Sequence, residues 1–176
     1  MAHLETLISE DDLQARIRDL GAELAALYGD EPVIAVGVLK GSILFMADLV
    51  RAMKGCDVRL SFLGVASYHG TESTGVVRVT HDLTEPIEGE HVLVIEDIVD
   101  SGLTLAYIRE MLNVRRPKSL RVVSLLDKPM KRTVDVAVEF TGFSIPDAFV
   151  VGYGLDLDQK YRNVPYIAIY HPDASR

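Results

Sequence analysis

The sequence predicts an α/β protein with a central, mainly parallel sheet flanked by helices. Solid apolar runs, typical of strands buried on both faces, occupy residues 33–39 and 92–95, and another buried strand is predicted over the mostly apolar residues 120–126. Apolar residues recur at helical spacing over residues 11–28, 43–53 and 105–112. Buried strands that alternate with helices are the pattern of a doubly wound parallel sheet. The chain of 176 residues has no repeat or linker, so we expect one domain over residues 1–176.

The N-terminal half reads as helix, strand, helix and strand. Ser9 or Asp11 can cap the first helix, and Gly29 to Pro32 ends it before the strand at 33–39. A turn at Lys40-Gly41-Ser42 leads into the second helix, and the next strand covers residues 58–66. Residues 67–75, which include Ser67 and Tyr68, are polar and carry two glycines, so they are expected to form a mobile loop that acts as a lid.

The C-terminal half predicts mostly strands. After the strand at 120–126, further strands are expected at 134–140, 148–153 and 166–170. We expect the N-terminal helix and the last strands to form a small cap, or hood, over the main sheet.

Composition excludes several classes of protein. The net charge of −8 argues against nucleic-acid binding, which requires a basic face. The apolar runs are too short to cross a bilayer, so no membrane partner is expected. The N-terminus shows no secretion signal, and the single Cys56 fits a reducing compartment. Together these features predict a cytoplasmic protein.

A strand, an acidic turn and a helix follow one another over residues 91–105. The apolar run ends in Glu96 and Asp97, and Asp100 precedes a small-residue turn of Ser101, Gly102, Leu103 and Thr104. Free N–H groups at a helix start bind anions, and a glycine lets the backbone approach a phosphate. Carboxylates would repel a bare phosphate, but they suit a ligand that also carries a divalent cation and sugar hydroxyls. The alternative is an ordinary capped strand-turn-helix.

Other polar residues follow the predicted strands at the same edge of the sheet. Ligands of such sheets bind beyond the carboxyl ends of the strands. Each residue alone could be a solvated strand end, but several on one rim favour a site. They are Lys40, Ser67, Tyr68, Glu96, Asp97, Lys128 and Asp156.

The stretch at 91–105 resembles the phosphoribosyl-pyrophosphate signature of purine phosphoribosyltransferases. The chain is similar to the hypoxanthine-guanine phosphoribosyltransferase family over nearly its whole length. The segments that carry this resemblance are 37–42, 67–70, 124–129 and 145–156, with Tyr161-Arg162 beyond. It implies the type I phosphoribosyltransferase fold and transfer of a phosphoribosyl group from phosphoribosyl pyrophosphate to a 6-oxopurine, with Mg²⁺ as cofactor.

The resemblance also implies roles on the phosphate side. Residues 100–104 (Asp100, Ser101, Gly102, Leu103 and Thr104) would cradle the 5′-phosphate, with Asp100 as general base or acid near purine N7. Glu96 and Asp97 would hold the ribose hydroxyls and the magnesium. Lys40, Gly41 and Arg162 would bind pyrophosphate, and a cis peptide is expected between Leu39 and Lys40.

On the base side, the resemblance implies that Lys128 donates a hydrogen bond to the 6-oxo group. Phe149 would stack on the ring, and the Val150 carbonyl would accept from the base. Asp156 would hold a second magnesium through water. A homodimer or homotetramer is expected. Two alternatives stay open: a non-catalytic nucleotide-sensing regulator on the same fold, and an enzyme for another base, such as xanthine or a pyrimidine.

Overall fold

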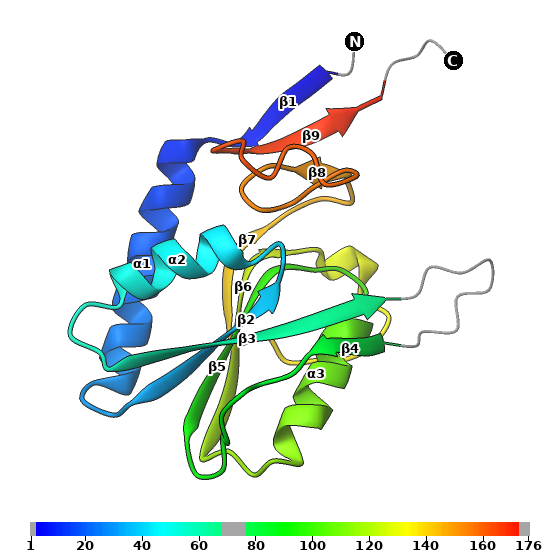
Figure 1. Cartoon of the computed structure of the whole chain (residues 1–176). Helices are drawn as coiled ribbons and strands as arrows, with labels where there is room; N and C mark the ends of the chain where they lie inside the picture. The colour runs from blue at the N-terminus through cyan, green and yellow to red at the C-terminus, as the bar shows by residue number, and fades with distance from the viewer. Residues whose placement is uncertain (1–2, 68–76, 173–176) are drawn as a thin grey trace.

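The structure is a computed structural model that describes residues 3–67 and 77–172. Its main sheet has six strands in the order β4-β3-β2-β5-β6-β7, all parallel except the antiparallel edge strand β4 (Figure 1). The strands are β2 (Val33–Leu39), β3 (Val58–Ser67), β4 (Val77–His81), β5 (His91–Val99), β6 (Ser119–Asp127) and β7 (Phe140–Ser144). The predicted parallel sheet is therefore confirmed.

Three helices cover the two faces of this sheet (Figure 1). The helices α1 (Glu10–Tyr28) and α2 (Ile43–Ala52) lie on one face, and α3 (Leu103–Asn113) lies on the other. Ser9 caps α1, because its hydroxyl accepts a hydrogen bond from the Asp12 amide at 3.2 Å. Along β5, Leu93 and Ile95 face α1 and α2, while the alternate residues face α3. Both faces of the central strands are buried, as their solid apolar runs predicted.

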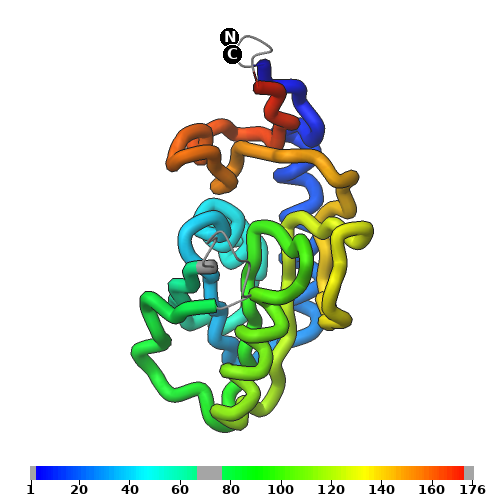
Figure 2. The backbone as a smooth tube through the Cα atoms, turned by 90° about the vertical axis from the view of Figure 1, so that its right-hand side faces the viewer, coloured from blue at the N-terminus to red at the C-terminus, as the bar shows by residue number. Residues whose placement is uncertain are grey.

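The hood is a separate three-stranded sheet in the order β1-β9-β8. Its first and last segments, blue and red in Figure 2, lie together at one end of the molecule. It consists of β1 (His3–Ile8), β8 (Val150–Val151) and β9 (Ile167–His171), paired antiparallel. The N-terminal segment contributes a strand to it, whereas α1 packs on α2 and the main sheet. The expectation that the N-terminal helix belongs to the hood was therefore wrong.

Two predicted strands differ from the structure. Residues 134–139 form no ladder, and the strand starts at Phe140. Side chains replace the ladder bonds there, since the Glu139 carboxylate accepts from the Val122 amide and Arg109 donates to the Ala137 carbonyl. The strand predicted at 148–153 is only two residues long, because the chain then turns through Gly152.

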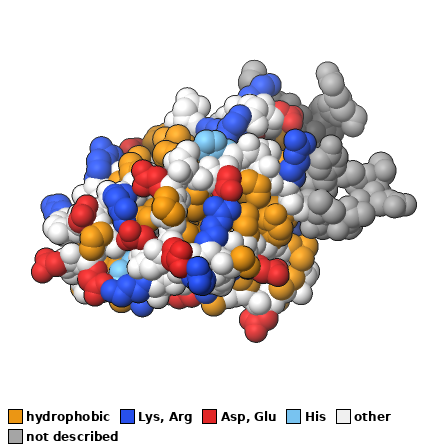
Figure 3. Space-filling model, turned by 60° about the horizontal axis from the view of Figure 1, so that its bottom comes forward, with side chains coloured by type: hydrophobic (Ala, Val, Ile, Leu, Met, Phe, Trp, Pro, Cys, Tyr) orange, Lys and Arg blue, Asp and Glu red, His pale blue; other side chains and the backbone are white. Residues whose placement is uncertain are grey.

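Charged side chains of both signs are interspersed on the face shown in Figure 3, which offers no continuous basic surface. Among the described residues, no helix is long and apolar enough to cross a membrane.

Candidate active site

Residues 100–104 connect the end of β5 to the start of α3, and we call them the phosphate loop after the role predicted for them. Gly102 is the N-cap of α3, and its φ of +87° is a conformation that side chains rarely adopt. A Cβ atom at Gly102 would lie 2.9 Å from a methyl group of Val136, so this position requires glycine. The Thr133 amide donates to the Ser101 carbonyl at 2.9 Å and holds the loop in place. The loop thus places the first amides of α3 at the edge of the sheet, beside the cavity that Ser101, Gly102 and Thr104 line.

The side chains of this loop have different exposures. Asp100 is exposed, and it lines the same cavity as Ser101 and Thr104. Leu103 does not line that cavity and is 46% exposed, so only its backbone is available to a phosphate. Ser101 accepts a hydrogen bond from the Leu103 amide at 3.4 Å, which fixes the hydroxyl close to the helix start.

Two carboxylates, Glu96 and Asp97, stand in the last part of β5, which runs on to Val99. Glu96 is buried, with 6% of its surface exposed. Burial raises the pKa of Glu96 well above its ordinary value, and the neighbouring Asp97 carboxylate raises it further. Burial also raises the pKa of Asp97 to about 6, although hydrogen bonds from backbone amides, including that of Ile98, oppose the change. Asp97 itself is half-buried. Adjacent acids whose pKa values are raised in this way suit a ligand that brings positive charge.

The turn after β2 lies directly against Asp97. The peptide bond between Leu39 and Lys40 is cis, as the resemblance predicted. A Cβ atom on Gly41 would lie 1.5 Å from Asp97 Oδ2, so the absence of a side chain at Gly41 lets the carboxylate reach the turn. Lys40 is exposed, and its ammonium donates to the Gln159 side chain at 3.3 Å.

The loop that follows β8 supplies the far wall of the site. Asp156 forms an ion pair with the Arg162 guanidinium at 2.7 Å, and the same guanidinium donates a hydrogen bond to the Gly154 carbonyl at 2.6 Å. Arg162 therefore pairs with Asp156, and both side chains belong to the same wall of the site.

These groups line one cavity of about 310 Å³. It runs from the phosphate loop past the acid pair to the Lys40 turn and to Asp156. The predicted site residues that line it are Lys40, Gly41, Glu96, Asp97, Asp100, Ser101, Gly102, Thr104, Asp156 and Arg162.

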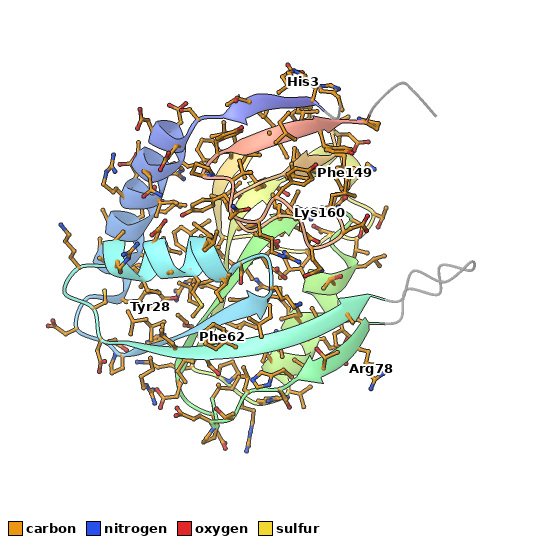
Figure 4. The ribbon with its side chains drawn as sticks, turned by 45° about the horizontal axis from the view of Figure 1, so that its top comes forward. His3, Tyr28, Phe62, Arg78, Phe149 and Lys160 are labelled. Carbon is orange, nitrogen blue, oxygen red and sulfur yellow. The ribbon has the colours of Figure 1, made fainter. Side chains whose placement is uncertain are left out.

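Three other predicted residues stand beside this cavity rather than in its wall. The Lys128 amide donates to the Val99 carbonyl at 3.0 Å, which places Lys128 next to the end of β5. Its ammonium is buried and donates to the Ala148 carbonyl at 2.7 Å. Phe149 follows and is 52% exposed on the hood segment (Figure 4), whereas the side chain of Val150 is buried. Asp100, Lys128 and Phe149 therefore lie on one side of the molecule.

Comparison with known proteins identifies the family. A model of the phosphoribosyl transferase domain matches residues 8–158. The hypoxanthine-guanine phosphoribosyltransferase of Bacillus subtilis is 47% identical over 169 residues, which cover 96% of this chain and 93% of that protein. This chain belongs to the phosphoribosyltransferase family.

Other phosphoribosyltransferases agree in sequence and in fold. The hypoxanthine phosphoribosyltransferase of Haemophilus influenzae is 47% identical over 169 residues, covering 94% of each protein. A crystal structure of a hypoxanthine phosphoribosyltransferase from Staphylococcus aureus superposes with a TM-score of 0.92 at 46% identity, covering 98% of this chain and 94% of that one. The type I phosphoribosyltransferase fold, with its hood, is thus confirmed.

Part of the predicted phosphoribosyltransferase site lies outside the described residues. Tyr68 and the rest of the expected lid through residue 75 belong to that part. Ser67 is the last residue of β3, and Val65 on the same strand lines the cavity.

Sequence reasoning missed two residues that shape this phosphoribosyltransferase site. A Cβ atom on Gly154 would lie 2.0 Å from the Gly41 carbonyl oxygen, so Gly154 packs directly on the turn after β2. Arg132 donates to the Asp100 carbonyl at 3.2 Å and pairs with Asp127, which anchors the phosphate loop from below. The spaced glycines at 152 and 154 were a signal of close backbone approach, but nothing in the sequence singles out Arg132.

Proposed function

We propose that this protein transfers the phosphoribosyl group of phosphoribosyl pyrophosphate to N9 of hypoxanthine or guanine. The products are IMP or GMP and pyrophosphate. The observation that carries the proposal is one sheet edge with three parts side by side: a loop at a helix start, the adjacent acids Glu96 and Asp97, and a buried lysine. The names and the identity of the relatives support the same reaction.

The phosphate loop would bind the 5′-phosphate. The amides at the start of α3, together with the helix dipole, stabilise a dianion without any cationic side chain. Asp100 is exposed in this loop. It would accept the proton that the purine loses at N7 as the new glycosidic bond forms, and would return that proton in the reverse reaction.

The base would lie between Lys128 and Phe149. An ammonium group carries three donors and no acceptor, so Lys128 can bond to the Ala148 carbonyl and still donate to a 6-oxo group. It cannot accept from the amino group of adenine, which gives a physical reason for a 6-oxopurine. Phe149 offers an exposed ring for stacking, and the Val150 carbonyl would accept from the N1–H or 2-amino group of the base.

We propose Mg²⁺ as the cofactor. Carboxylate oxygens are suitable ligands, and Glu96, Asp97 and Asp156 are the candidates. No group of three acid, histidine or cysteine residues within residues 3–67 and 77–172 is arranged to hold a metal by itself. Mg²⁺ usually takes one or two carboxylates and completes its shell with water and substrate phosphates, so this donor set fits. When bound, the ion neutralises negative charge on the departing pyrophosphate.

Pyrophosphate would leave along the turn after β2. Lys40, Gly41 and Arg162 all line the cavity. The guanidinium of Arg162 is oriented by Asp156 and by the Gly154 carbonyl, so it is held ready for a phosphate oxygen.

We further propose a cytoplasmic homodimer or homotetramer. Exposed apolar side chains on α2 and β3, namely Ile43, Leu44 and Leu60, support self-association through that face. Cys56 is a free thiol, which fits a reducing compartment. Sedimentation of the purified protein tests the assembly.

One assay tests the reaction. The protein is incubated with Mg²⁺, phosphoribosyl pyrophosphate and one base at a time, and the nucleotide products are separated by chromatography. We expect IMP and GMP, no AMP or UMP, and no product when EDTA removes the metal. XMP or UMP as the main product would favour an enzyme for another base, and no product with any base would favour a regulator.

A variant sharpens the test of the base site. Lys128→Met keeps the length of the side chain and removes the donor, so KM for hypoxanthine should rise at least about tenfold while KM for phosphoribosyl pyrophosphate stays the same. An unchanged KM for hypoxanthine would remove Lys128 from base recognition.

A further inference from the structure

A buried tyrosine connects the hood loop to the main body of the protein. Tyr153 lies in the loop after β8, is 5% exposed and has a φ of +47°, a conformation that non-glycine residues rarely adopt. Its hydroxyl donates to the Asp48 carboxylate of α2. Gln14 of α1 donates to the same carboxylate oxygen at 3.0 Å, and Arg51 pairs with the other oxygen. Asp48 thus joins three parts of the chain that are distant in sequence.

The residues next to Tyr153 touch the pyrophosphate side of the site. Gly154, the following residue, packs on the Gly41 carbonyl so closely that a Cβ atom would lie 2.0 Å away. Gly41 in turn packs on Asp97, where a Cβ atom would lie 1.5 Å from Oδ2. These contacts form a continuous stack from the hood loop through the turn after β2 to the acid pair.

The same loop also orients Arg162. The Gly154 amide donates to the Arg162 carbonyl at 2.9 Å, and the Arg162 guanidinium returns a bond to the Gly154 carbonyl. Asp48 lies on α2, the helix that directly follows the Lys40 turn. A bond between Asp48 and Tyr153 therefore ties both walls of the pyrophosphate side to one another.

We propose that Tyr153 and Asp48 are positioning residues for the pyrophosphate half of the site, which we call the hood latch. The proposal rests on the proposed function, because it assigns the latch to the phosphoribosyl pyrophosphate substrate. Neither side chain lines the cavity, so the latch acts through Gly154 and Arg162 and touches no substrate itself. The latch keeps the Gly41 backbone in contact with Asp97 on one side and with Gly154 on the other, which is the geometry that pyrophosphate needs as it leaves.

The base half of the site has a separate support. The Tyr170 amide of β9 donates to the Phe149 carbonyl at 2.9 Å, and β8 pairs with β9 at Val150 and Val151. Loss of the latch should therefore affect one substrate and spare the other. A tyrosine that only stabilised the fold would change both substrates equally or neither.

Tyr153→Phe tests the latch, because it removes only the hydroxyl. Tyr28→Phe is the matched control, since the Tyr28 hydroxyl is buried and has no hydrogen-bond partner among the described residues. We measure KM for phosphoribosyl pyrophosphate and for hypoxanthine, kcat, and the dissociation constant of phosphoribosyl pyrophosphate with Mg²⁺ by calorimetry. Thermal unfolding by circular dichroism shows whether each variant is folded.

The latch predicts a selective effect. In Tyr153→Phe, KM and the dissociation constant for phosphoribosyl pyrophosphate should rise at least about fivefold, while KM for hypoxanthine changes less than about twofold. Asp48→Asn should shift the same two constants in the same direction, and Tyr28→Phe should shift neither. Unchanged binding of phosphoribosyl pyrophosphate in a folded Tyr153→Phe protein, or an equal rise for both substrates, overturns the latch. An inactive wild-type protein contradicts the proposed function instead, and calorimetry still tests the latch.

Discussion

Replacing Gly41 by alanine should separate activity from stability. The added Cβ atom would lie 1.5 Å from Asp97 Oδ2, and real Cβ contacts are essentially never below 3.0 Å. The two atoms must therefore move apart by at least 1.5 Å, which is the difference between these distances. The Gly41 carbonyl is already against Gly154, so retreat of the backbone is restricted and the Asp97 carboxylate is the group that moves.

The expected loss of folding stability is small, whereas the expected loss of catalytic rate is large. Asp97 Oδ1 accepts from the Ile98 amide at 2.9 Å, and loss of that bond on rotation costs about 1 kcal/mol of folding stability. For a domain of this size, such a loss lowers Tm by about 2–4 °C. A misplacement of about 1 Å at a reacting centre, by contrast, can cost a factor of about 100 in rate. We therefore expect kcat/KM to fall about a hundredfold, or about 2.7 kcal/mol of transition-state stabilisation.

Two more variants complete the experiment. Gly154→Ala would place its Cβ 2.0 Å from a backbone oxygen at a φ of +100°, so it should lose both activity and several degrees of Tm. Gly89→Ala also has a positive φ but no atom within 4 Å of its Cβ, so it should cost stability and leave kcat/KM unchanged. If Gly41→Ala keeps kcat/KM within about threefold of the wild type, then activity does not depend on the exact position of the Asp97 carboxylate, contrary to this prediction.

Two further predictions concern the acids. Asp100→Asn keeps the shape of the loop but removes the proton acceptor, so steady-state kinetics should show kcat for IMP formation lower by about a hundredfold or more; near-normal kcat would exclude the acid–base role. Burial raises the pKa of Asp97 to about 6 from 3.8, so between about pH 4 and 6 the folded protein retains a proton that the unfolded chain has released. The contribution of Asp97 to the stability of the ligand-free protein is thus fully present below about pH 4 and is lost as pH rises through about 6. Between about pH 4 and 6, the free energy of unfolding measured in urea should fall more steeply with rising pH for the wild type than for Asp97→Asn. Parallel pH dependences of the two proteins would contradict this assignment to Asp97.

The sequence predicted the elements whose pattern is local. β2 is a solid apolar run, β5 contains one, and β6 is mostly apolar. The helices α1 and α3 have clear helical periodicity, so burial on one or both faces decides the structure of all these elements. β1 was missed because only its last residue, Ile8, is buried and because it is stabilised by pairing with β9 near the other end of the sequence, as His3 with His171. Such a distant partner leaves no trace in local periodicity.

Over residues 134–139, by contrast, the sequence predicted a strand that the structure does not contain. Val134, Val136 and Val138 alternate with the more exposed residues Asp135, Ala137 and Glu139, as the residues of a strand would. Val136 and Val138 do pack against the apolar cluster beneath α3. The backbone partners are absent, because Glu139 and Arg109 side chains take the hydrogen bonds that a ladder would make. Period-two burial therefore predicts which side chains are inside, but it does not predict the ladder.

The candidate site was predictable where chemistry follows a strand end in sequence. Lys40, Glu96, Asp97 and Asp100 come directly after or within strands, and parallel topology brings them to one edge. The contacts between the hood loop and this edge were not predictable, because they depend on how Gly154, Tyr153 and Arg162 fold back over the turn after β2.

The acidic composition of the chain raises the question of how it attracts a polyphosphate. It carries 26 acidic and 18 basic residues, so attraction cannot come from the net field. The phosphate loop uses backbone amides and a helix dipole, which act only at short range. In the proposed function, the Glu96 and Asp97 carboxylates would favour a phosphate that arrives with Mg²⁺ over a free phosphate. Recognition of such a metal-loaded donor would depend on local contacts, and its affinity should change little with salt compared with that of a basic nucleic-acid-binding protein.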